Sequence, residues 1–484
     1  MGKLIHLGTI ASTLLTTLLL SACTSAPPLP AGPLSDCRQL FLDLDREVAE
    51  AGVRDWGPRP IAGFPFLRVN RFLASFRHEP MDGPQIAAWV GEMAALDAAA
   101  RQLELANLSR SRVTPPSPGL GAQLGQCRNL LVANLLQQPP HIQLLRQRTS
   151  VSDDYSRAWR IAGLYPLASL FVARGIERWH RDTQQTFGMP LTELPVRGQL
   201  RRWGHPASGP ASSPLPGAEQ NALGIPQLTE QQVRALFQRH APIWEIDVVD
   251  DNDLVGTAHW RGGPVIDTDL ASQYQLLSYT RFDDQVLVQL NYVIWFKARP
   301  GDDIYAGDID GLTWRVTLGA DGVPWLYDSV HNCGCYHQFF PTAMLQPRDD
   351  RHWPEPPLLP QRAPSEPLVV RLESGRHFIQ RLYTYRGGAT PRPLRLESYN
   401  RLRSLPTIDG HHSLFGRQGL VAGSERRERF LLWPMGIRSP GAMRQWGRHA
   451  VAFLGRRHFD DPRLIETLFR RAPQRPPATE DNSR

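Results

Sequence analysis

Residues 285–300 read QVLVQLNYVIWFKARP, a stretch in which apolar side chains occupy every second position. Since successive side chains of a β-strand point to opposite faces, this alternation predicts a strand with one apolar face and one mixed face. The apolar face would carry Val286, Val288, Leu290, Tyr292, Ile294 and Phe296. The mixed face would carry Gln289, Asn291, Trp295 and Lys297. The stretch therefore predicts a sheet with one side turned to a core.

Further strands follow at short intervals. LTWRVTL at 312–318 and VPWLYDSVH at 323–331 have the composition of strands, and ADG between them is typical of a turn. We therefore expect an antiparallel β-rich domain over residues 227–340, followed by a Pro-rich loop at 341–367. A basic, mixed α/β region would occupy residues 368–471, with a helix over 439–459 that begins at Ser439 and Pro440. Residues 472–484 would form a disordered tail.

The N-terminal part has a different periodicity. Apolar residues at helical spacing in SDCRQLFLDLDREVAEAG and the alanine-rich stretch 83–108 predict a mainly helical domain over residues 36–203. A Pro-, Ser- and Gly-rich linker or long loop would follow at 204–226. The predicted fold class is α+β, with an N-terminal helical region, an antiparallel β-meander domain and a mixed C-terminal region.

The charge of the chain is unevenly distributed. Residues 241–310 hold 13 Asp and Glu against 4 Lys and Arg, a net charge of −9, whereas residues 351–484 hold 24 Arg against 12 acids, a net charge of +12. All but two of the 54 basic residues are arginine, a skew more typical of a GC-rich genome than of phosphate binding. Because opposite patches can neutralise each other, we expect no nucleic-acid partner despite the pI near 9.4.

The first 23 residues, MGKLIHLGTIASTLLTTLLLSAC, have the pattern of a targeting segment. One lysine precedes an apolar stretch that is too short to span a membrane comfortably, and small residues precede Cys23. The LSAC tetrapeptide resembles the lipobox of bacterial lipoproteins. The resemblance implies a signal peptide at 1–22, acylation of Cys23, a tether at 23–35 and an outer-membrane protein that faces the periplasm.

Four cysteines remain besides Cys23. In an oxidising compartment an even number suggests disulfides, and Cys37 with Cys127 would form a structural one. Such a bridge closes a long loop and would contribute roughly 4 kcal/mol in the chain-entropy model.

The motif HNCGCYH at 331–337 is the sharpest chemical candidate. His331, Cys333, Cys335 and His337 alternate, so a straight strand would spread them over roughly 20 Å, too far for one metal. Only a fold at Gly334 could bring them together around zinc or copper. A Cys333–Cys335 disulfide, structural or redox-active, and two separate buried thiols are the alternatives. Asp328, Gln289 and Asn291 are expected nearby.

Other patterns are weaker. Arg426, Arg427 and Arg429 could bind an anion, or could instead pair with the acidic segment 241–310. We find no nucleophile elbow, zinc-protease motif, P-loop or dinucleotide fingerprint, and no catalytic residue can be named.

Two functions remain open. One is a non-catalytic envelope lipoprotein that binds a protein, lipid or polysaccharide partner or has a structural role. The other is a lipid-anchored periplasmic metal or thiol-redox protein, or an enzyme, centred on HNCGCYH.

Overall fold

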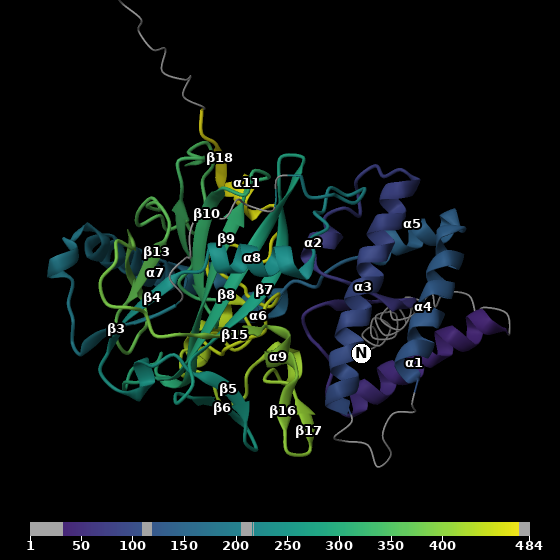
Figure 1. The fold of residues 1–484 in the computed structure, drawn as a ribbon, viewed down its shortest axis with the longest axis horizontal. Helices are drawn as coiled ribbons and strands as arrows, with labels where there is room; N and C mark the ends of the chain where they lie inside the picture. The colour runs from purple at the N-terminus through teal and green to yellow at the C-terminus, as the bar shows by residue number, and fades with distance from the viewer. Residues whose placement is uncertain (1–31, 109–118, 205–214, 216, 474–484) are drawn as a thin grey trace, which may run out of the picture.

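The computed structural model describes residues 32–108, 119–204, 215 and 217–473. Within them the chain is α+β, as predicted, and Figure 1 shows a helical part beside a larger β-rich part. Cys23, the signal peptide, most of the tether and nearly all of the C-terminal tail lie outside the described residues.

The helical part packs around a short antiparallel hairpin. Its elements are α1 (Pro33–Glu50), β1 (Arg59–Ile61), β2 (Phe64–Val69), α2 (Arg71–Ala74), α3 (Gly83–Leu108), α4 (Leu120–Leu136) and α5 (Pro139–Arg148). Phe41, Leu44 and Val48 form the buried stripe of α1, which the helical spacing predicted. They join a core that includes Trp89 of α3 and Leu131 of α4.

The predicted Cys37–Cys127 disulfide is present and links α1 to α4 across a sequence separation of 90 residues. Because both helices contribute side chains to the same core, the bond fixes the two walls of this part against each other.

The predicted meander is the centre of a six-stranded sheet with strand order β11-β10-β9-β8-β7-β15. Its strands are β7 (Ser272–Phe282), β8 (Gln285–Arg299), β9 (Gly307–Leu318), β10 (Pro324–His331), β11 (Gln338–Pro341) and β15 (Arg395–Ser398). The first five pair antiparallel in chain order, whereas β15 runs parallel to β7. The turn at residues 319–323 is closed by a hydrogen bond from Gly319 N–H to the Val323 carbonyl.

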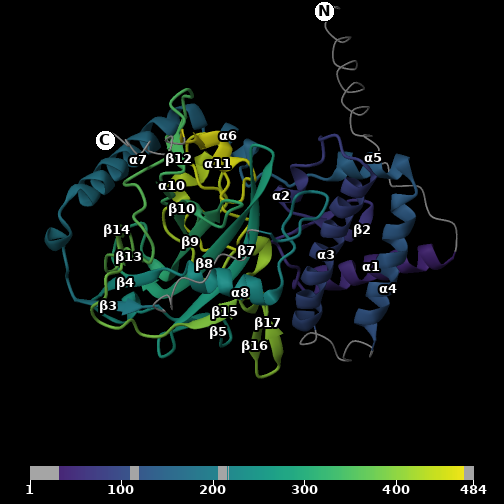
Figure 2. The ribbon, with the colours of Figure 1, turned by 45° about the horizontal axis from the view of Figure 1, so that its top comes forward.

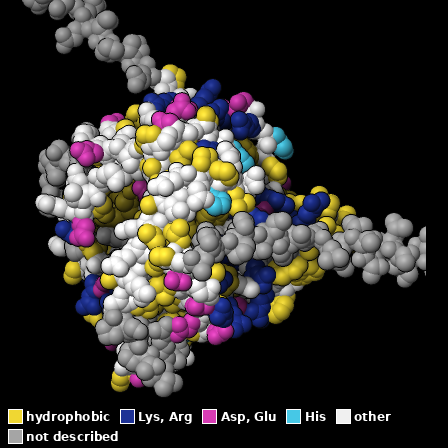
Figure 3. Space-filling model, turned by 90° about the vertical axis from the view of Figure 1, so that its right-hand side faces the viewer, with side chains coloured by type: hydrophobic (Ala, Val, Ile, Leu, Met, Phe, Trp, Pro, Cys, Tyr) yellow, Lys and Arg dark blue, Asp and Glu magenta, His cyan; other side chains and the backbone are white. Residues whose placement is uncertain are grey.

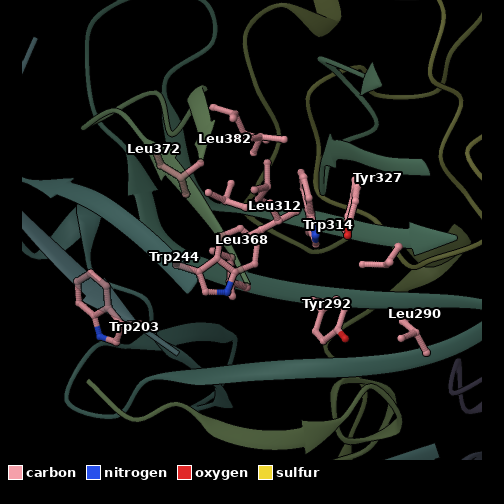
Figure 4. Close-up of a cluster of buried hydrophobic side chains, with 14 of the residues drawn as sticks. Trp203, Trp244, Leu290, Tyr292, Leu312, Trp314, Tyr327, Leu368, Leu372 and Leu382 are labelled. Atoms are coloured by element: carbon pink, nitrogen blue, oxygen red, sulfur yellow. The ribbon is translucent and has the colours of Figure 1, made fainter. Parts of the chain in front are cut away.

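A four-stranded sheet, β14-β13-β4-β3, covers one face of the six-stranded sheet. Its strands are β3 (Gln199–Trp203), β4 (Ile243–Val248), β13 (Leu368–Leu372) and β14 (Ile379–Thr384). Figure 4 shows Trp244 and Leu368 of this sheet against Tyr292, Leu312 and Trp314 of the other. The hydrophobic core therefore lies between two sheets, as in a sandwich.

The remaining elements cover the edges and ends of the sheets. They are α6 (Arg157–Ala162), α7 (Tyr165–Gly188), α8 (Glu230–Arg239), β5 (Thr257–Trp260), β6 (Pro264–Asp267), β12 (Leu345–Pro347), α9 (Asn400–Arg403), β16 (Leu405–Thr407), β17 (Gly410–His412), α10 (Arg429–Leu432), α11 (Leu464–Leu468) and β18 (Phe469–Arg471). Short 3₁₀ turns occur at Leu191–Glu193, Asp251–Asp253, Arg417–Gly419 and Trp433–Met435.

Strand β8 is buried on both faces, which the alternation did not predict. The even positions from Val288 to Phe296 enter the core between the sheets. On the opposite face Val293 and Trp295 enter a second core, and Gln289 and Asn291 are buried in hydrogen bonds with neighbouring strands. Charged side chains in the middle of the sheet, such as Arg315 and Asp328, are therefore surrounded by protein, whereas Lys297 near the end of β8 is exposed.

The helical domain predicted for residues 36–203 is divided in the structure. Helix α7 lies on the β-rich side, away from α1–α5 in both ribbon views (Figures 1 and 2), and Phe187 at its end enters the core between the sheets. Strand β3 pairs with β4. Of the predicted linker, Leu223 and Ile225 are buried in the helical core rather than free. Local periodicity identified helices but not the core that each helix joins.

The prediction of a helix over residues 439–459 is wrong, because this segment is irregular in the structure. Backbone N–H groups of this segment donate to distant carbonyls, for example Arg444 to Asn332 and Gln445 to Gly419. Its apolar side chains are buried among several elements, so tertiary contacts override the local capping pattern.

Ion pairs join the two parts of the molecule. Arg281 of β7 donates to Glu79 at 2.9 Å, and Arg71 of α2 donates to Asp460 at 3.1 Å. Figure 3 shows the face at the helical end, where basic, acidic and hydrophobic side chains all occur.

Removing the disulfide should destabilise the helical part. We expect the double substitution Cys37→Ser and Cys127→Ser to lower the unfolding free energy by roughly 4 kcal/mol at most, because the unfolded chain regains the entropy of an open loop. Urea unfolding, with Cys333→Ser as the control for loss of a thiol, measures the change. Equal stability of the double variant and the parent chain would contradict the role given to this bond.

Candidate functional site

The HNCGCYH motif connects the end of β10 to the start of β11. The chain turns back at Gly334, the fold that a metal site would have required, and both Gly334 (φ 94°) and Tyr336 (φ 61°) have left-handed backbone conformations. Within the loop, Gly334 N–H donates to the His331 carbonyl at 2.7 Å, and His331 N–H donates to the Cys335 carbonyl at 3.0 Å. The Gly334 Cα lies so close to the chain that an added Cβ would be 2.8 Å from the Ala450 carbonyl oxygen.

His331 is turned towards a buried carboxylate. Its Nδ1 lies 3.8 Å from Asp310, whose other oxygen lies 2.8 Å from Nδ1 of His377. Although burial alone would raise the pKa of Asp310, the electrostatic contacts with the two histidines hold that pKa well below its usual value. His377 also stacks on Phe296 with ring centroids 3.8 Å apart.

His337 has a separate partner. Its Nε2 lies 2.8 Å from Asp328, which also accepts two hydrogen bonds from Arg315, at 2.9 and 2.5 Å. Burial lowers the pKa of His337 to about 4, against the opposing effect of Asp328, so the ring is neutral at physiological pH. Asp328 therefore lies beside the motif as expected, whereas Gln289 and Asn291 bond to Thr317 and to the Leu276 carbonyl.

The two cysteines are free thiols in the structure, Cys333 buried and Cys335 half-buried. The Cys335 N–H lies 3.4 Å from the Cys333 sulfur. A hydrogen bond with Cys333, together with burial, raises the pKa of Cys335 well above its usual value. Since the thiolate is the reactive form, Cys335 is a poor nucleophile in this setting.

The four side chains of the motif do not converge. Among the described residues, no three His, Cys, Asp or Glu side chains are grouped so that they could hold a metal ion. Each histidine faces a different carboxylate, and these lie on different strands, Asp310 on β9 and Asp328 on β10. The zinc or copper site suggested by the spacing thus lacks a ligand set in this part of the chain.

A cavity of about 670 Å³ lies against the motif. Helix α7 forms one wall, and the segment around α10 forms another. The α7 wall consists of Ala168, Phe171, Val172, Gly175, Ile176 and Trp179, with the charged side chains of Arg178 and Asp182 on the same helix. Cys333, Gly334, Cys335, Tyr336 and His337 line the cavity from the motif. Trp179 and Tyr336 meet with ring centroids 5.3 Å apart, so helix and motif contact each other directly at this point.

Several polar atoms of the lining residues have no partner among the described residues. They include Nε1 of Trp179, a donor, and Nδ1 of His337, an acceptor when Nε2 carries the proton. Glu428 is only 4% exposed and no hydrogen bond to its carboxylate is seen in the described structure. Burial raises the pKa of Glu428 to about 7, despite Arg299, Arg426 and Arg444 nearby.

Arg299 is the buried cation of the cavity. Its guanidinium lies 5.3 Å from the ring centre of Tyr305, 5.8 Å from that of Tyr336 and 5.4 Å from that of Phe378. Asp303 lies 4.0 Å away and offsets its charge. Apolar surface with a few hydrogen-bonding groups and compensated charge is the usual lining of a small-molecule site.

The three arginines proposed to bind an anion contact protein instead. Arg426 is buried and donates to the carbonyls of Asp308 and Ile309 at 2.8 and 2.6 Å. Arg427 donates to the carbonyls of Asp302 and Asp303. Arg429 lies over the Phe430 ring. Two of the three thus reach the acidic segment, the alternative considered from the sequence, through its backbone.

Comparisons with known proteins give no functional guide. No family model matches the chain, and no curated protein and no solved structure is significantly similar to it. Of the helices within the described residues, none is both long enough and apolar enough to cross a membrane.

The sequence indicated the motif but missed the α7 wall and Glu428. The signal for the α7 wall was present in residues 168–179, where apolar side chains recur every three or four positions, but the same pattern is expected of any core helix. No local signal distinguishes Glu428 from its exposed neighbours.

Gly334→Ala should be costly because a left-handed backbone and a contact with Ala450 coincide there. We expect a loss of about 1–3 kcal/mol in unfolding free energy. Gly262→Ala is the matched control, since Gly262 has φ 77° but open space around it. Similar losses in urea unfolding for both variants would show that the contact with Ala450 contributes nothing.

Buried His337 should also make stability depend on pH. Its pKa is about 4 in the folded chain against 6.5 for the free side chain, so the unfolded state binds more protons between these values. Stability from this group is complete above pH 6.5 and falls by up to about 1.4 kcal/mol per pH unit on acidification towards pH 4. Urea unfolding between pH 7 and 4.5 should show a steeper fall for the parent chain than for His337→Asn. Parallel curves would contradict the assignment.

Proposed function

We propose that this chain is a lipid-anchored envelope protein that binds an amphiphilic small molecule in the cavity between α7 and the HNCGCYH motif. The observation that carries the proposal is the cavity itself. Its volume of about 670 Å³ lies within the range of roughly 300–1,000 Å³ usual for ligand sites.

The lining favours a ligand with an apolar chain and a small hydrogen-bonding head. Phe171, Val172 and Ile176 of α7 offer apolar surface. Trp179 Nε1 can donate to the head, and His337 Nδ1 can accept from it. Because leaving such groups buried without a partner costs about 1–3 kcal/mol each, a hydroxyl- or amide-bearing head that satisfies them gains affinity.

The charges of the cavity favour a head without a strong net charge. Arg299 already faces Asp303, and Glu428, with a pKa of about 7, is only partly ionised at neutral pH. An anionic head would meet Glu428, and a cationic head would meet Arg299.

Binding explains the motif better than thiol or metal chemistry does. His337 pairs with Asp328 at 2.8 Å, His331 faces Asp310 at 3.8 Å, and the raised pKa of Cys335 keeps that thiol protonated. The loop forms one wall of the cavity, in which Gly334 permits the turn and Tyr336 supplies an aromatic surface.

The cellular setting of the proposal rests on the sequence. The lipobox-like LSAC segment would anchor Cys23 in the outer membrane by its acyl chains, facing the periplasm. A lipid-derived molecule is a natural ligand in that setting.

Ligand binding can be tested by filling the cavity. Fluorescence titration with a nitrobenzoxadiazole-labelled monoacylglycerol should show saturable binding, displaced by unlabelled monoacylglycerol. Ala168→Trp should weaken binding at least about tenfold, equivalent to about 1.4 kcal/mol, because the new ring occupies the ligand volume.

Gln184→Trp is the matched control, since Gln184 is exposed on the same helix and does not line the cavity. It should bind the probe as the parent chain does. Equal affinity of Ala168→Trp and the parent, with both folded by circular dichroism, would contradict the proposal, as would failure of the parent chain to bind the probe.

A further inference from the structure

Helices α6 and α7 and the turn between them expose large apolar side chains on the surface above the cavity. Ile161, Leu164, Leu167, Leu170 and Phe171 are between 61% and 72% exposed. Phe430 and Leu431 of α10 add a second group, 65% and 62% exposed. We call these seven side chains the apolar ridge. A contiguous group of this kind is unusual on a soluble surface and marks a site of interaction.

The ridge is held outward by contacts on the inner side of the same helices. Arg160 of α6 donates to the carbonyls of Met435 and Gly455 at 2.8 and 2.6 Å. Gly163 lies so close to Pro434 that an added Cβ would overlap it. At the far end of α7, Thr183 and Phe187 are buried. The apolar side chains therefore face solvent because the opposite side of each helix is already engaged.

The rim of the ridge is basic. Exposed arginines at 157, 174, 178 and 181 lie on α6 and α7, and Arg427 and Arg438 lie beside α10. The exposed acids of α6, α7 and the segment 425–438 are Glu177, Asp182 and Glu425. The guanidinium of Arg438 lies 5.3 Å from the ring centre of Trp159, a cation–π contact, and the Arg438 side chain stays exposed.

We infer that the apolar ridge inserts into the surface of an anionic lipid bilayer, with the surrounding arginines at the level of the headgroups. Leucine and phenylalanine on one face with arginine at the rim is the composition of helices that lie in a membrane interface. Arginines near an anionic surface add electrostatic attraction. A partner protein would need an equally apolar surface with acidic groups at its edge, whereas an anionic bilayer offers both over any area.

The ridge also borders the cavity. Phe171 and Leu431 belong to the ridge and line the cavity at the same time. With the ridge in the lipid, the cavity would open at the bilayer surface, and an amphiphile could enter without crossing water. Entry of the ligand by this route rests on the proposed function, whereas insertion of the ridge into the bilayer does not depend on it.

The test uses an environment-sensitive fluorophore attached to the full chain at Leu170→Cys. The parent chain is treated with the same fluorophore, and this measures the labelling of its own thiols. Gln184→Cys, exposed on the same helix outside the ridge, is the matched position. With vesicles of phosphatidylcholine and phosphatidylglycerol, the label at 170 should shift its emission to the blue and be quenched by spin-labelled lipids. The label at 184 should show neither effect.

The blue shift of the label at 170 should decrease when the vesicles carry no charge, and also when the ridge loses apolar surface. Vesicles of phosphatidylcholine alone should give a weaker shift at 170, and adding Leu167→Asp should abolish it. No shift at 170, or equal shifts at 170 and 184, would overturn the inference. A blue shift without vesicles that depends on protein concentration would also overturn it, because a second copy of the chain would then cover the ridge.

The two proposals can fail separately. Ala168→Trp fills the cavity and should leave the response at 170 unchanged, whereas Leu167→Asp lies outside the cavity lining and should leave binding of soluble monoacylglycerol unchanged. If both variants lose both membrane insertion and monoacylglycerol binding, circular dichroism shows whether they have unfolded. If they are still folded, the result would contradict the claim that ridge and cavity act separately.

Discussion

Burial of the central strands on both faces is the constraint on which the site depends. With a four-stranded sheet on one side and a second core on the other, the charged side chains of Asp310, Arg315 and Asp328 have no route to water. Isolated charges are very unfavourable in such a position, so each must find a partner inside the sheet. Asp328 pairs with Arg315 and His337, and Asp310 pairs with His377 and His331.

These pairs decide what the HNCGCYH loop can do. A histidine whose ring faces a buried carboxylate cannot also join the two thiols in binding a metal ion. The motif, whose spacing resembles that of a metal site, therefore forms one wall of the cavity. Gly334 and Tyr336 then give the loop its shape, and the thiols are left facing a cavity that α7 closes from the other side. The same arrangement leaves the apolar ridge on the outer surface of the helices above.

The parts of the structure that depend on local pattern were predictable. Alternation over 285–300 identified β8, helical spacing identified α1, and cysteine count with compartment identified Cys37–Cys127. The sequence also showed that the motif could fold at Gly334, because glycine permits it, but it connected this fold with a metal site. Each of these features is decided by residues close in sequence or by a covalent constraint.

Features decided by distant partners were not predictable. His377 lies 67 residues from Asp310, and nothing near either residue indicates that they meet. Residues 439–459 carry a helix-start pattern, yet their N–H groups bond to Asn332 and Gly419 because the segment fills a space between other elements. The α7 wall was missed for a similar reason, since periodicity shows that a helix has an apolar face but not whether that face meets a core, a cavity or lipid.

The most direct test of this account is a crystal structure of the full chain grown with a monoacylglycerol. We expect electron density for the acyl chain between α7 and the motif, with the head near Trp179 and His337, both thiols reduced and each histidine still facing its carboxylate. An empty cavity with the ligand bound elsewhere, or a metal ion held by Cys333 and Cys335, would contradict it.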